Sequence, residues 1–439
     1  MSWQQEYKNK LITLEEAVGK VKSGMTIQIG IAASEPVGLL EELARQKDRL
    51  ENVTLWTCLP MRSYDIFMKP EMEGHFFNEN WFYGVPDRQV HPEGRVSYTP
   101  NNLHGAAIDK LAGNGGQLDI MMGTCTPPNN EGLISLSMGV VVEREMIDAA
   151  DMVILEVNPL MPWTEGDTVI PMSKVDYFVE NPAPLITTPP VVPSEVEVQI
   201  GQHIARYIDD GCTIQLGIGG VPTAIAEQIA DRRHLGVHTE LLVDGYLPLI
   251  KSGAIDNSRK TLHPGKYVAI FAIGSQELYD FMGESKDVRI MRGSYVNDPY
   301  VIAKNDKMIS INSAIQVDVM GQVCSQSIGT RHFSGTGGQL DTHRGAVMSK
   351  GGRGIIALRS TAKKGTISTI VPTLAPGSGV TVPSQDVDTI VTEYGSAELR
   401  GLCVRDRMEA LIKIAHPAFR DSIREDAHRL GIVPDKRFF

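Results

Sequence analysis

The sequence predicts an α/β protein with two similar domains, in each of which a largely parallel sheet is covered by helices. Short apolar stretches such as TIQLGI, KYVAIFAIG and DTIVTEY are typical of buried strands, and they alternate with stretches of helical periodicity. At 439 residues the chain is too long for one ordinary hydrophobic core, which favours two domains. An internal repeat indicates that the two domains have a similar build.

The repeat is centred on a short strand. Residues 24–31 read GMTIQIGI and residues 211–218 read GCTIQLGI, and each stretch is preceded by an amphipathic helix and followed by proline and a second helix. The match resumes downstream, where Trp56 falls opposite Glu240. A duplicated scaffold needs its core in both copies but its reactive groups in only one. The second half is therefore expected to carry the chemistry.

A proline-rich segment separates the two halves. Residues 181–197, NPAPLITTPPVVPSEVE, contain five prolines and show no hydrophobic periodicity, as is typical of an extended linker. The predicted domains are residues 1–190 and residues 191–439.

Composition excludes several classes of protein. The N-terminal MSWQQEYKNK is polar, and no apolar run reaches the roughly 18 residues of a membrane helix, so a cytoplasmic protein without a membrane partner is expected. The net charge of −11 is spread along the chain, which argues against a nucleic-acid partner. Five scattered cysteines without a CxxC pair indicate neither a disulfide framework nor a zinc site.

The main candidate site combines a glycine turn with a carboxylate. Residues 215–222, QLGIGGVP, precede Glu240, which lies in the apolar run TELLVDG. The turn is either a tight strand-to-helix connection or a loop that binds phosphates or an oxyanion. Pro222 breaks the dinucleotide fingerprint, and no Gly-Lys-Ser/Thr follows. Glu240 is either a solvent-facing residue of an edge strand or a nucleophile toward an activated acyl group, and its apolar neighbours favour the nucleophile.

Three further features are candidates for the same site. The cluster FSGTGGQLD has Gly335, Gly337 and Gly338, which either donate N–H groups to an oxyanion or form a bulge or hairpin. Asn297 either orients a carboxylate or belongs only to a turn. Glu393 binds substrate or steadies the site, or it pairs with Arg400 on the surface.

Serine-hydrolase and metal-hydrolase chemistry find little support in the sequence. His238 and His416 lack partners at triad or metal-ligand spacing, and there is no GxSxG elbow. No metal ligand is therefore assigned.

Several long motifs in one order resemble the acetyl-CoA hydrolase/transferase family. They are TPPNNEGLISLSMG and EVNP in the first half, and QLGIGGVP, HTELLVDG, YVNDP, FSGTGGQLD, VTEYGSAELRG and IAHP in the second. Within that family the chain is similar to 4-hydroxybutyrate and butyryl-CoA:acetate CoA-transferases. The resemblance implies two α/β domains of the CoA-transferase type.

The resemblance also implies a reaction. Glu240 would form an acyl-glutamyl anhydride and then a glutamyl-CoA thioester, with ping-pong transfer of CoA between a short-chain acyl-CoA (butyryl-, 4-hydroxybutyryl- or propionyl-like) and acetate. Coenzyme A is then a substrate, and no permanently bound cofactor is expected. A homo-oligomer, a dimer or larger, is expected as well. The alternatives are an acyl-CoA hydrolase and a non-enzymatic sensor of an acyl-CoA or a sugar phosphate.

Family positions carry over to particular residues of this chain. Gly338 would supply an oxyanion N–H, Asn297 would orient Glu240, and Glu393 would support the site. The residues implied in CoA binding are Gln215, Leu216, Gly217, Ile218, Gly219, Ile315, Gly337 and Gly338. Two departures stand out: Thr342 replaces a usual phenylalanine, which is expected to alter packing behind the glycine loop, and Trp163 lies where some relatives have arginine.

Overall fold

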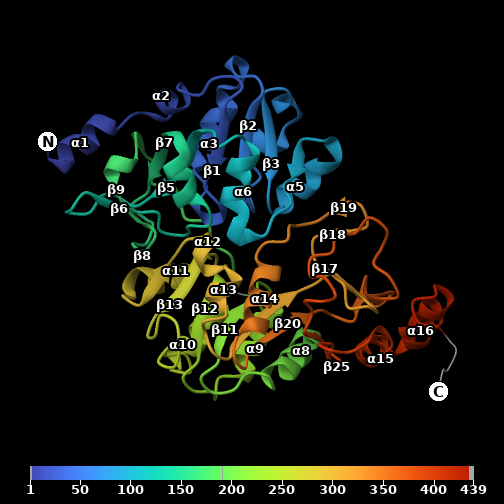
Figure 1. Cartoon of the computed structure of the whole chain (residues 1–439). Helices are drawn as coiled ribbons and strands as arrows, with labels where there is room; N and C mark the ends of the chain where they lie inside the picture. Colours follow the sequence, from blue (N-terminus) through green and yellow to red (C-terminus); the bar gives the residue numbers. More distant parts are fainter. Residues whose placement is uncertain (1, 190, 435–439) are drawn as a thin grey trace. The chain divides into compact units, whose positions relative to one another are not determined.

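The computed structural model describes residues 2–189 and 191–434. The chain forms two compact units: unit 1 comprises Met1–Pro189 and Tyr267–Val296, and unit 2 comprises Pro190–Lys266 and Asn297–Phe439 (Figure 1). Both units contain parallel strands with helices, so the predicted α/β class is confirmed. Within the described ranges, no helix is both long and apolar enough to cross a membrane.

Unit 1 contains a seven-stranded sheet in the order β10-β7-β5-β1-β2-β3-β4, and all neighbouring strands of the sheet are parallel. The strands are β1 (Thr26–Ile29), β2 (Val53–Thr57), β3 (Phe76–Asn80), β4 (Val96–Tyr98), β5 (Leu118–Cys125), β7 (Ala150–Val157) and β10 (Tyr177–Glu180). Helices of unit 1 include α1 (Trp3–Lys10), α2 (Leu14–Val18), α3 (Val37–Arg45), α4 (Asp65–Met68), α5 (Val85–Val90), α6 (Ala106–Gly113) and α7 (Glu143–Ala149).

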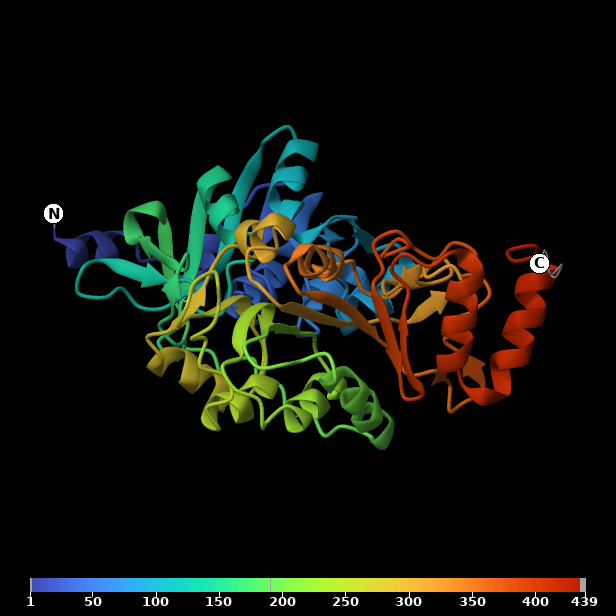
Figure 2. The same cartoon turned by 60° about the horizontal axis from the view of Figure 1, so that its bottom comes forward.

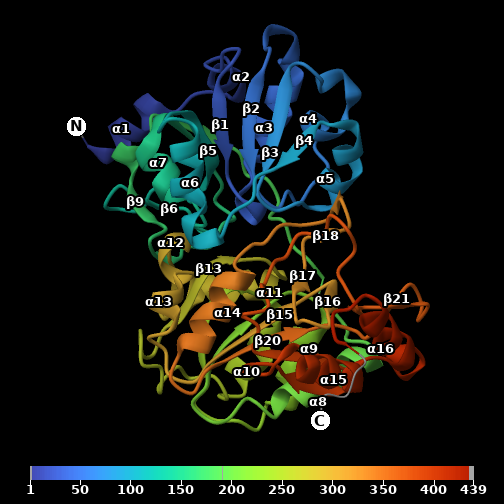
Figure 3. The same cartoon turned by 45° about the vertical axis from the view of Figure 1, so that its right-hand side comes forward.

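The two faces of the unit 1 sheet are covered by different helices. Leu55 of β2 belongs to the apolar core that includes Leu39 and Leu43 of α3. The next residue, Trp56, points to the opposite face because side chains alternate along a strand. There its ring lies 4.9 Å from Nζ of Lys110 on α6. Helices α3 and α6 therefore cover opposite faces of the sheet (Figure 3).

The segment Tyr267–Val296 lies beyond the predicted boundary at residue 190, yet it packs in unit 1. It contains β13 (Tyr267–Ala272), α11 (Gln276–Glu284), β14 (Val288–Ile290) and α12 (Gly293–Val296). Strand β14 pairs with β8 (Glu165–Gly166), and the N–H of Val140 donates to the carbonyl of Ile270 at 3.0 Å. Backbone hydrogen bonds thus hold this segment in unit 1, and unit 2 is formed from two separate stretches of chain.

Unit 2 is built on a sheet in the order β25-β24-β20-β15-β11-β12. Its strands are β11 (Thr213–Leu216), β12 (Gly236–Leu242), β15 (Met308–Ser313), β20 (Arg353–Ala357), β24 (Thr389–Thr392) and β25 (Gly395–Glu398). Neighbours are parallel except for β25, which runs antiparallel to β24. All four residues of β11 are buried, as expected for a central parallel strand.

Helices of unit 2 include α8 (Glu195–Ala205), α9 (Gly220–Gln228), α10 (Leu247–Lys251), α13 (Pro299–Ile302) and α14 (Gln339–Met348). Helix α8 begins at the end of the proline-rich segment with a capping box between Ser194 and Glu197. Helices α15 (Val404–Ile414) and α16 (Arg420–Arg429) lie side by side near the C-terminus (Figure 2), where Arg424 pairs with Glu409. Their apolar residues share one core with β20 and β24.

Strand registers correct one detail of the internal repeat. Thr26 of β1 pairs with Thr54, whereas Thr213 of β11 pairs with Gly236. Gly236 is therefore the structural counterpart of Thr54, and the prediction that Trp56 lies opposite Glu240 is wrong by two residues. A shift of two keeps every side chain on the same face of a strand, so the hydrophobic pattern contains no signal that detects it.

Candidate active site

Glu240 lies near the end of β12, half-buried, with two donors from other segments of unit 2. The amide Nδ2 of Asn297 donates to Oε2 of Glu240 at 2.8 Å. Burial raises the pKa of Glu240 to about 7; the Asp341 charge raises it further, while hydrogen bonds from Asn297 and from the N–H of Gly338 oppose the rise. The carboxylate is therefore poorly solvated and yet held in one orientation, as a nucleophile requires.

The side chain of Asn297 is free to contact Glu240 because the next residue, Asp298, makes the hydrogen bond of the turn. Asp298 accepts the N–H of Tyr300 at 2.7 Å and caps α13. Asn297, which is fully buried, is left to point at the carboxylate, and its Oδ1 has no hydrogen-bond partner among the described residues. Of the two interpretations of this residue, the structure shows the carboxylate contact.

The second glycine cluster is neither a bulge nor a hairpin, because it leads directly into α14. Gly337 has φ of +54°, which few residues with side chains adopt, and Gly338 is the N-cap of the helix. A Cβ atom at Gly338 would overlap Nδ2 of Asn297 and Oε2 of Glu240. Only glycine therefore allows the backbone to approach the carboxylate this closely.

The first glycine turn joins β11 to α9, and the helix begins at Gly220, so that Pro222 lies in its first turn. Gly219 has φ of +109°. The N–H of Leu216 donates to the Tyr246 hydroxyl at 2.8 Å, and that of Gly217 donates to the carbonyl of Ile311 at 3.0 Å. For the amides of Ile218 and Gly219, no acceptor is found within the part of the chain that the structure describes. Of the four positions from Leu216 to Gly219, these two have amides that remain for a ligand.

A buried polar network lies directly behind this turn. The Ser310 hydroxyl donates to Oε1 of Gln215 at 2.7 Å, and its oxygen lies within hydrogen-bond distance of the Thr342 hydroxyl, at 3.0 Å. Nδ2 of Asn312 also donates to the Thr342 hydroxyl at 3.0 Å. The network joins β11, β15 and α14, so it connects the two glycine segments. Gln215 is 2% exposed and its side chain is used in this network, which leaves its backbone for a ligand.

Two other predicted site residues, Glu393 and Ile315, and Trp163, one of the two departures from the family pattern, each have hydrogen-bond partners of their own. The carboxylate of Glu393 accepts the N–H of Ser360 at 2.9 Å and its hydroxyl at 2.6 Å. Ile315 lies between β15 and β16 (Gln316–Asp318), and its N–H donates to the carbonyl of Cys324 at 2.9 Å. In unit 1, Nε1 of Trp163 donates to Glu165 at 3.0 Å.

Sequence reasoning missed two contributors to the site. Asp341 acts on Glu240 through its charge, and Tyr246 anchors the start of the glycine turn. Asp341 was visible in the motif GGQLD, three residues after Gly338, where the first turn of a helix places its side chain near the N-terminus. The contact from Tyr246 depends on the packing of the 3-10 helix Asp244–Tyr246 beside α9 and has no local signal.

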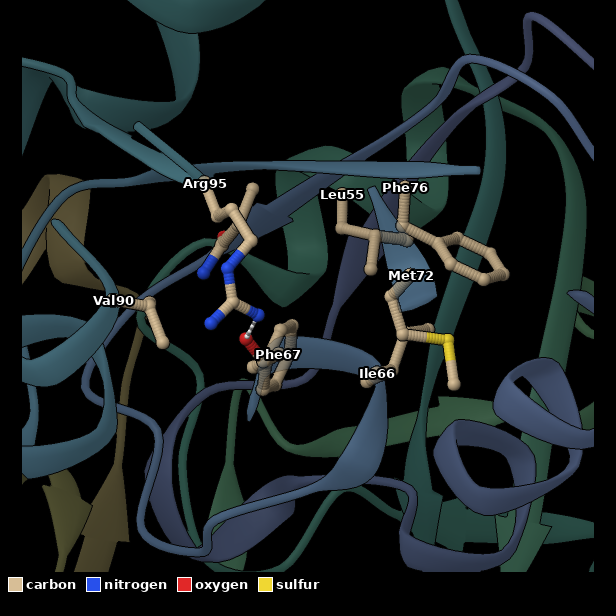
Figure 4. Close-up of a pocket in the computed structure, with 8 residues that line it drawn as sticks. Leu55, Ile66, Phe67, Met72, Phe76, Val90 and Arg95 are labelled. Atoms are coloured by element: carbon tan, nitrogen blue, oxygen red, sulfur yellow. Dashed lines mark hydrogen bonds between the residues drawn. The ribbon is translucent and has the colours of Figure 1, made fainter. Parts of the chain in front are cut away.

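A small cavity in unit 1 is not a candidate substrate site. Its lining includes Leu55, Ile66, Phe67 and Arg95, whose guanidinium donates to the carbonyl of Phe67 at 2.9 Å (Figure 4). Its volume is about 10 Å³. Such a space holds about one water molecule.

Two family models match most of the chain. The acetyl-CoA hydrolase/transferase N-terminal domain matches residues 1–192, and the C-terminal domain of the same family matches residues 274–427. The protein therefore belongs to the acetyl-CoA hydrolase/transferase family, which confirms the resemblance seen in its motifs.

Curated relatives agree along almost the whole length. The chain is 41% identical to a 4-hydroxybutyrate coenzyme A transferase of Clostridium kluyveri, over 97% of this chain and 99% of that protein. It is 36% identical to a butyryl-CoA:acetate CoA-transferase of Anaerostipes caccae, over 98% and 99%. A more distant relative is an acetyl-CoA hydrolase of Candida albicans, 27% identical over 75% of this chain and 69% of that protein.

Solved structures show the same fold. RipA from Yersinia pestis matches with a TM-score of 0.92 and 35% identity, covering 99% of this chain and 100% of that one. A 4-hydroxybutyrate CoA-transferase from Porphyromonas gingivalis matches with a TM-score of 0.79 and 36% identity, covering 98% and 100%.

Proposed function

We propose that the protein transfers coenzyme A between a short-chain acyl-CoA and a carboxylate such as acetate. The observation that carries the proposal is the Glu240 carboxylate, held by Asn297 and by the N–H of Gly338 in a poorly solvated position. Relatives named as CoA-transferases, similar along nearly the whole chain, support it.

The reaction begins when a Glu240 oxygen attacks the thioester carbonyl of the acyl-CoA. The C–S bond breaks, CoA leaves as thiolate, and an acyl-glutamyl anhydride remains. The thiolate then attacks the glutamyl carbonyl, which forms a glutamyl-CoA thioester and releases the first acid as carboxylate. A second carboxylate reverses these steps, so no net proton or water is consumed and the kinetics are ping-pong.

Both attacks pass through a tetrahedral oxyanion that needs fixed donors. Backbone N–H groups of the two glycine segments are suited to this role, because glycine lets the main chain approach the reacting carbon closely. One such donor contributes roughly 3 kcal/mol to acyl-transfer transition states. Asn297 orients the Glu240 carboxylate before attack.

Hydrolysis is the second candidate, since a relative named acetyl-CoA hydrolase shares part of the chain. Water would then attack the glutamyl-CoA thioester in place of the second carboxylate. CoA release measured with and without acetate separates the two functions. Transfer predicts that acetate accelerates acyl-CoA consumption many-fold, whereas a hydrolase consumes acyl-CoA at the same rate without it.

The covalent step is tested by mass spectrometry. When the protein is incubated with butyryl-CoA and no acceptor acid, we expect a CoA adduct on the peptide that contains Glu240. Glu240→Gln keeps the shape of the side chain and an oxygen that can accept the hydrogen bond from Asn297. We expect this variant to form no CoA adduct and to lose CoA-transfer activity. Transfer by Glu240→Gln at the parental rate would refute the proposal.

The acyl range, the location and the assembly belong to the same proposal. We propose butyryl-, 4-hydroxybutyryl- or propionyl-like groups as substrates, a cytoplasmic location and a dimer or larger assembly. Transfer rates with a panel of carboxylic acids test the acyl range. The molecular mass of the protein in solution tests the assembly.

A further inference from the structure

One arginine lies beside the first glycine turn with much of its side chain exposed. Arg359 follows β20 at the carboxyl end of the strand, the same edge of the parallel sheet from which the turn after β11 leaves. In open α/β sheets, ligands bind at this edge. Its side chain is 53% exposed, so it is both anchored and accessible.

Glu197 links Arg359 to the turn. Nη2 of Arg359 lies 3.0 Å from Oε1 of Glu197 and donates to the Ser194 hydroxyl at 3.3 Å. A Cβ atom at Gly220 would overlap the same Glu197 carboxylate, so the carboxylate lies directly against the turn. The Glu197 carboxylate therefore lies between the Arg359 guanidinium and the glycine turn and contacts both.

The loop that holds Arg359 is itself fixed. The carbonyl of Arg359 accepts the Thr369 hydroxyl at 2.6 Å, and the N–H and hydroxyl of the next residue, Ser360, donate to the Glu393 carboxylate. Glu393 therefore holds the Arg359 loop in place. A pre-ordered arginine loses less entropy when it binds a ligand.

Charge indicates what Arg359 binds. The chain has a net charge of −11, and Glu197 adds a negative charge at the turn, so a ligand with several phosphates is repelled unless a cation is placed there. The residues that follow Arg359 add Lys363 and Lys364 and no acidic group, at the tip of the hairpin between β21 (Thr361–Ala362) and β22 (Ile367–Ser368). The planar guanidinium matches a phosphate with two parallel hydrogen bonds.

We propose that Arg359 binds a phosphate of the nucleotide part of coenzyme A, and that Glu393 positions the loop that carries it. The inference rests on the proposed function for the identity of the ligand. We expect Arg359 to contact this remote part of the substrate equally in the ground state and in the transition state, and an interaction of that kind lowers KM without raising kcat. Its loss should therefore appear in KM rather than in kcat.

The test compares two thioesters with the same acyl group, butyryl-CoA and butyryl-pantetheine, which lacks the nucleotide and its phosphates. For Arg359→Gln we expect KM for butyryl-CoA to rise about tenfold, the loss of one charge-assisted contact, with little change in kcat. KM for butyryl-pantetheine should stay unchanged. Arg359→Lys keeps the positive charge but loses the two parallel N–H donors of the guanidinium. Its KM for butyryl-CoA should lie between the values of the parent and of Arg359→Gln.

Two controls separate binding from structure. Arg429→Gln removes an exposed arginine that pairs with Asp426 on α16, and it should change neither KM. Glu393→Gln weakens the hold on Ser360, and it should raise KM for butyryl-CoA by a smaller factor and leave the pantetheine substrate unaffected. Equal changes for both substrates in Arg359→Gln would show a structural role and overturn the proposal.

Direct binding keeps this result independent of catalysis. Calorimetry with free CoA should give a dissociation constant about tenfold higher for Arg359→Gln than for the parent. Unchanged CoA affinity overturns the role of Arg359 even where the Glu240 adduct forms. Absence of the adduct, with CoA affinity still dependent on Arg359, overturns the covalent mechanism alone.

Discussion

At the scale of single residues, Glu240 is balanced between opposing influences. Burial and the charge of Asp341 favour the protonated acid, whereas Asn297 and the N–H of Gly338 favour the carboxylate. A pKa of about 7 leaves both forms populated near neutrality. The ionised fraction is then only partly solvated and strongly nucleophilic.

This balance predicts how the rate depends on pH. Because Glu240 attacks as the carboxylate, kcat/KM for acyl-CoA should rise as the pH increases through about 7 and level off above it. The measurement is a pH profile of kcat/KM from pH 5 to 9 with butyryl-CoA. A profile that is flat between pH 5 and 8 would show that Glu240 does not titrate there.

Two variants should shift this profile in opposite directions. Asp341→Asn removes a charge that raises the pKa of Glu240, so its midpoint should move to lower pH. Asn297→Ala removes a hydrogen bond that lowers the pKa, so its midpoint should move to higher pH. Shifts of both variants in the same direction would contradict this assignment.

At the scale of elements, the polar network behind the glycine turn fixes α14 against β11 and β15. Ser310, Asn312 and Gln215 come from the two strands, and Thr342 comes from the helix. Since Gly338 is the N-cap of that helix, its N–H is positioned partly by this network. Thr342, which replaces a usual phenylalanine of the family, takes part in this network through its hydroxyl.

Thr342→Val tests the network, because valine keeps the shape and removes the hydroxyl. Ser310 and Asn312 would lose a partner, which costs about 1–3 kcal/mol where the groups stay buried. We expect the unfolding midpoint to fall and kcat to fall several-fold with KM for acyl-CoA nearly constant. Thr342→Ser keeps the hydroxyl and should retain kcat; equal losses in both variants would show that the methyl group matters instead.

At the scale of the whole molecule, unit 1 is formed from two separate stretches of the chain. After the first stretch of unit 2, Tyr267–Val296 returns to unit 1, and Asn297, which binds Glu240, is the first residue after that return. The division at residue 190 is therefore a boundary along the chain that does not coincide with the limits of the compact units.

This topology predicts the behaviour of a nicked protein. Val192 is 89% exposed, so a specific protease site inserted after it should be cut readily. The two fragments should still elute together in gel filtration, because the second fragment supplies Tyr267–Val296 to unit 1. Separation of the fragments without denaturant would contradict this expectation.

Local pattern was sufficient for much of the fold and part of the site. The strands TIQLGI and DTIVTEY, the capped start of α8 after the prolines, and the glycines around Gly219 and Gly338 all have sequence signals. Three features have no sequence signal: the two-residue shift between the halves, the return of Tyr267–Val296 to unit 1, and the contact of Tyr246 with the glycine turn. Each depends on which distant segments pair, and side-chain periodicity does not report this.

By itself the sequence determined the α/β class, the family and Glu240 as the candidate nucleophile, because these depend on local periodicity and on motifs of adjacent residues. The family resemblance implied roles for Asn297 and Gly338, but only the tertiary structure shows that they converge with Asp341 on that carboxylate, and that Glu393 binds the loop of Arg359. The pKa of Glu240 follows from that convergence, since burial and neighbouring charge exist only once distant segments have packed together.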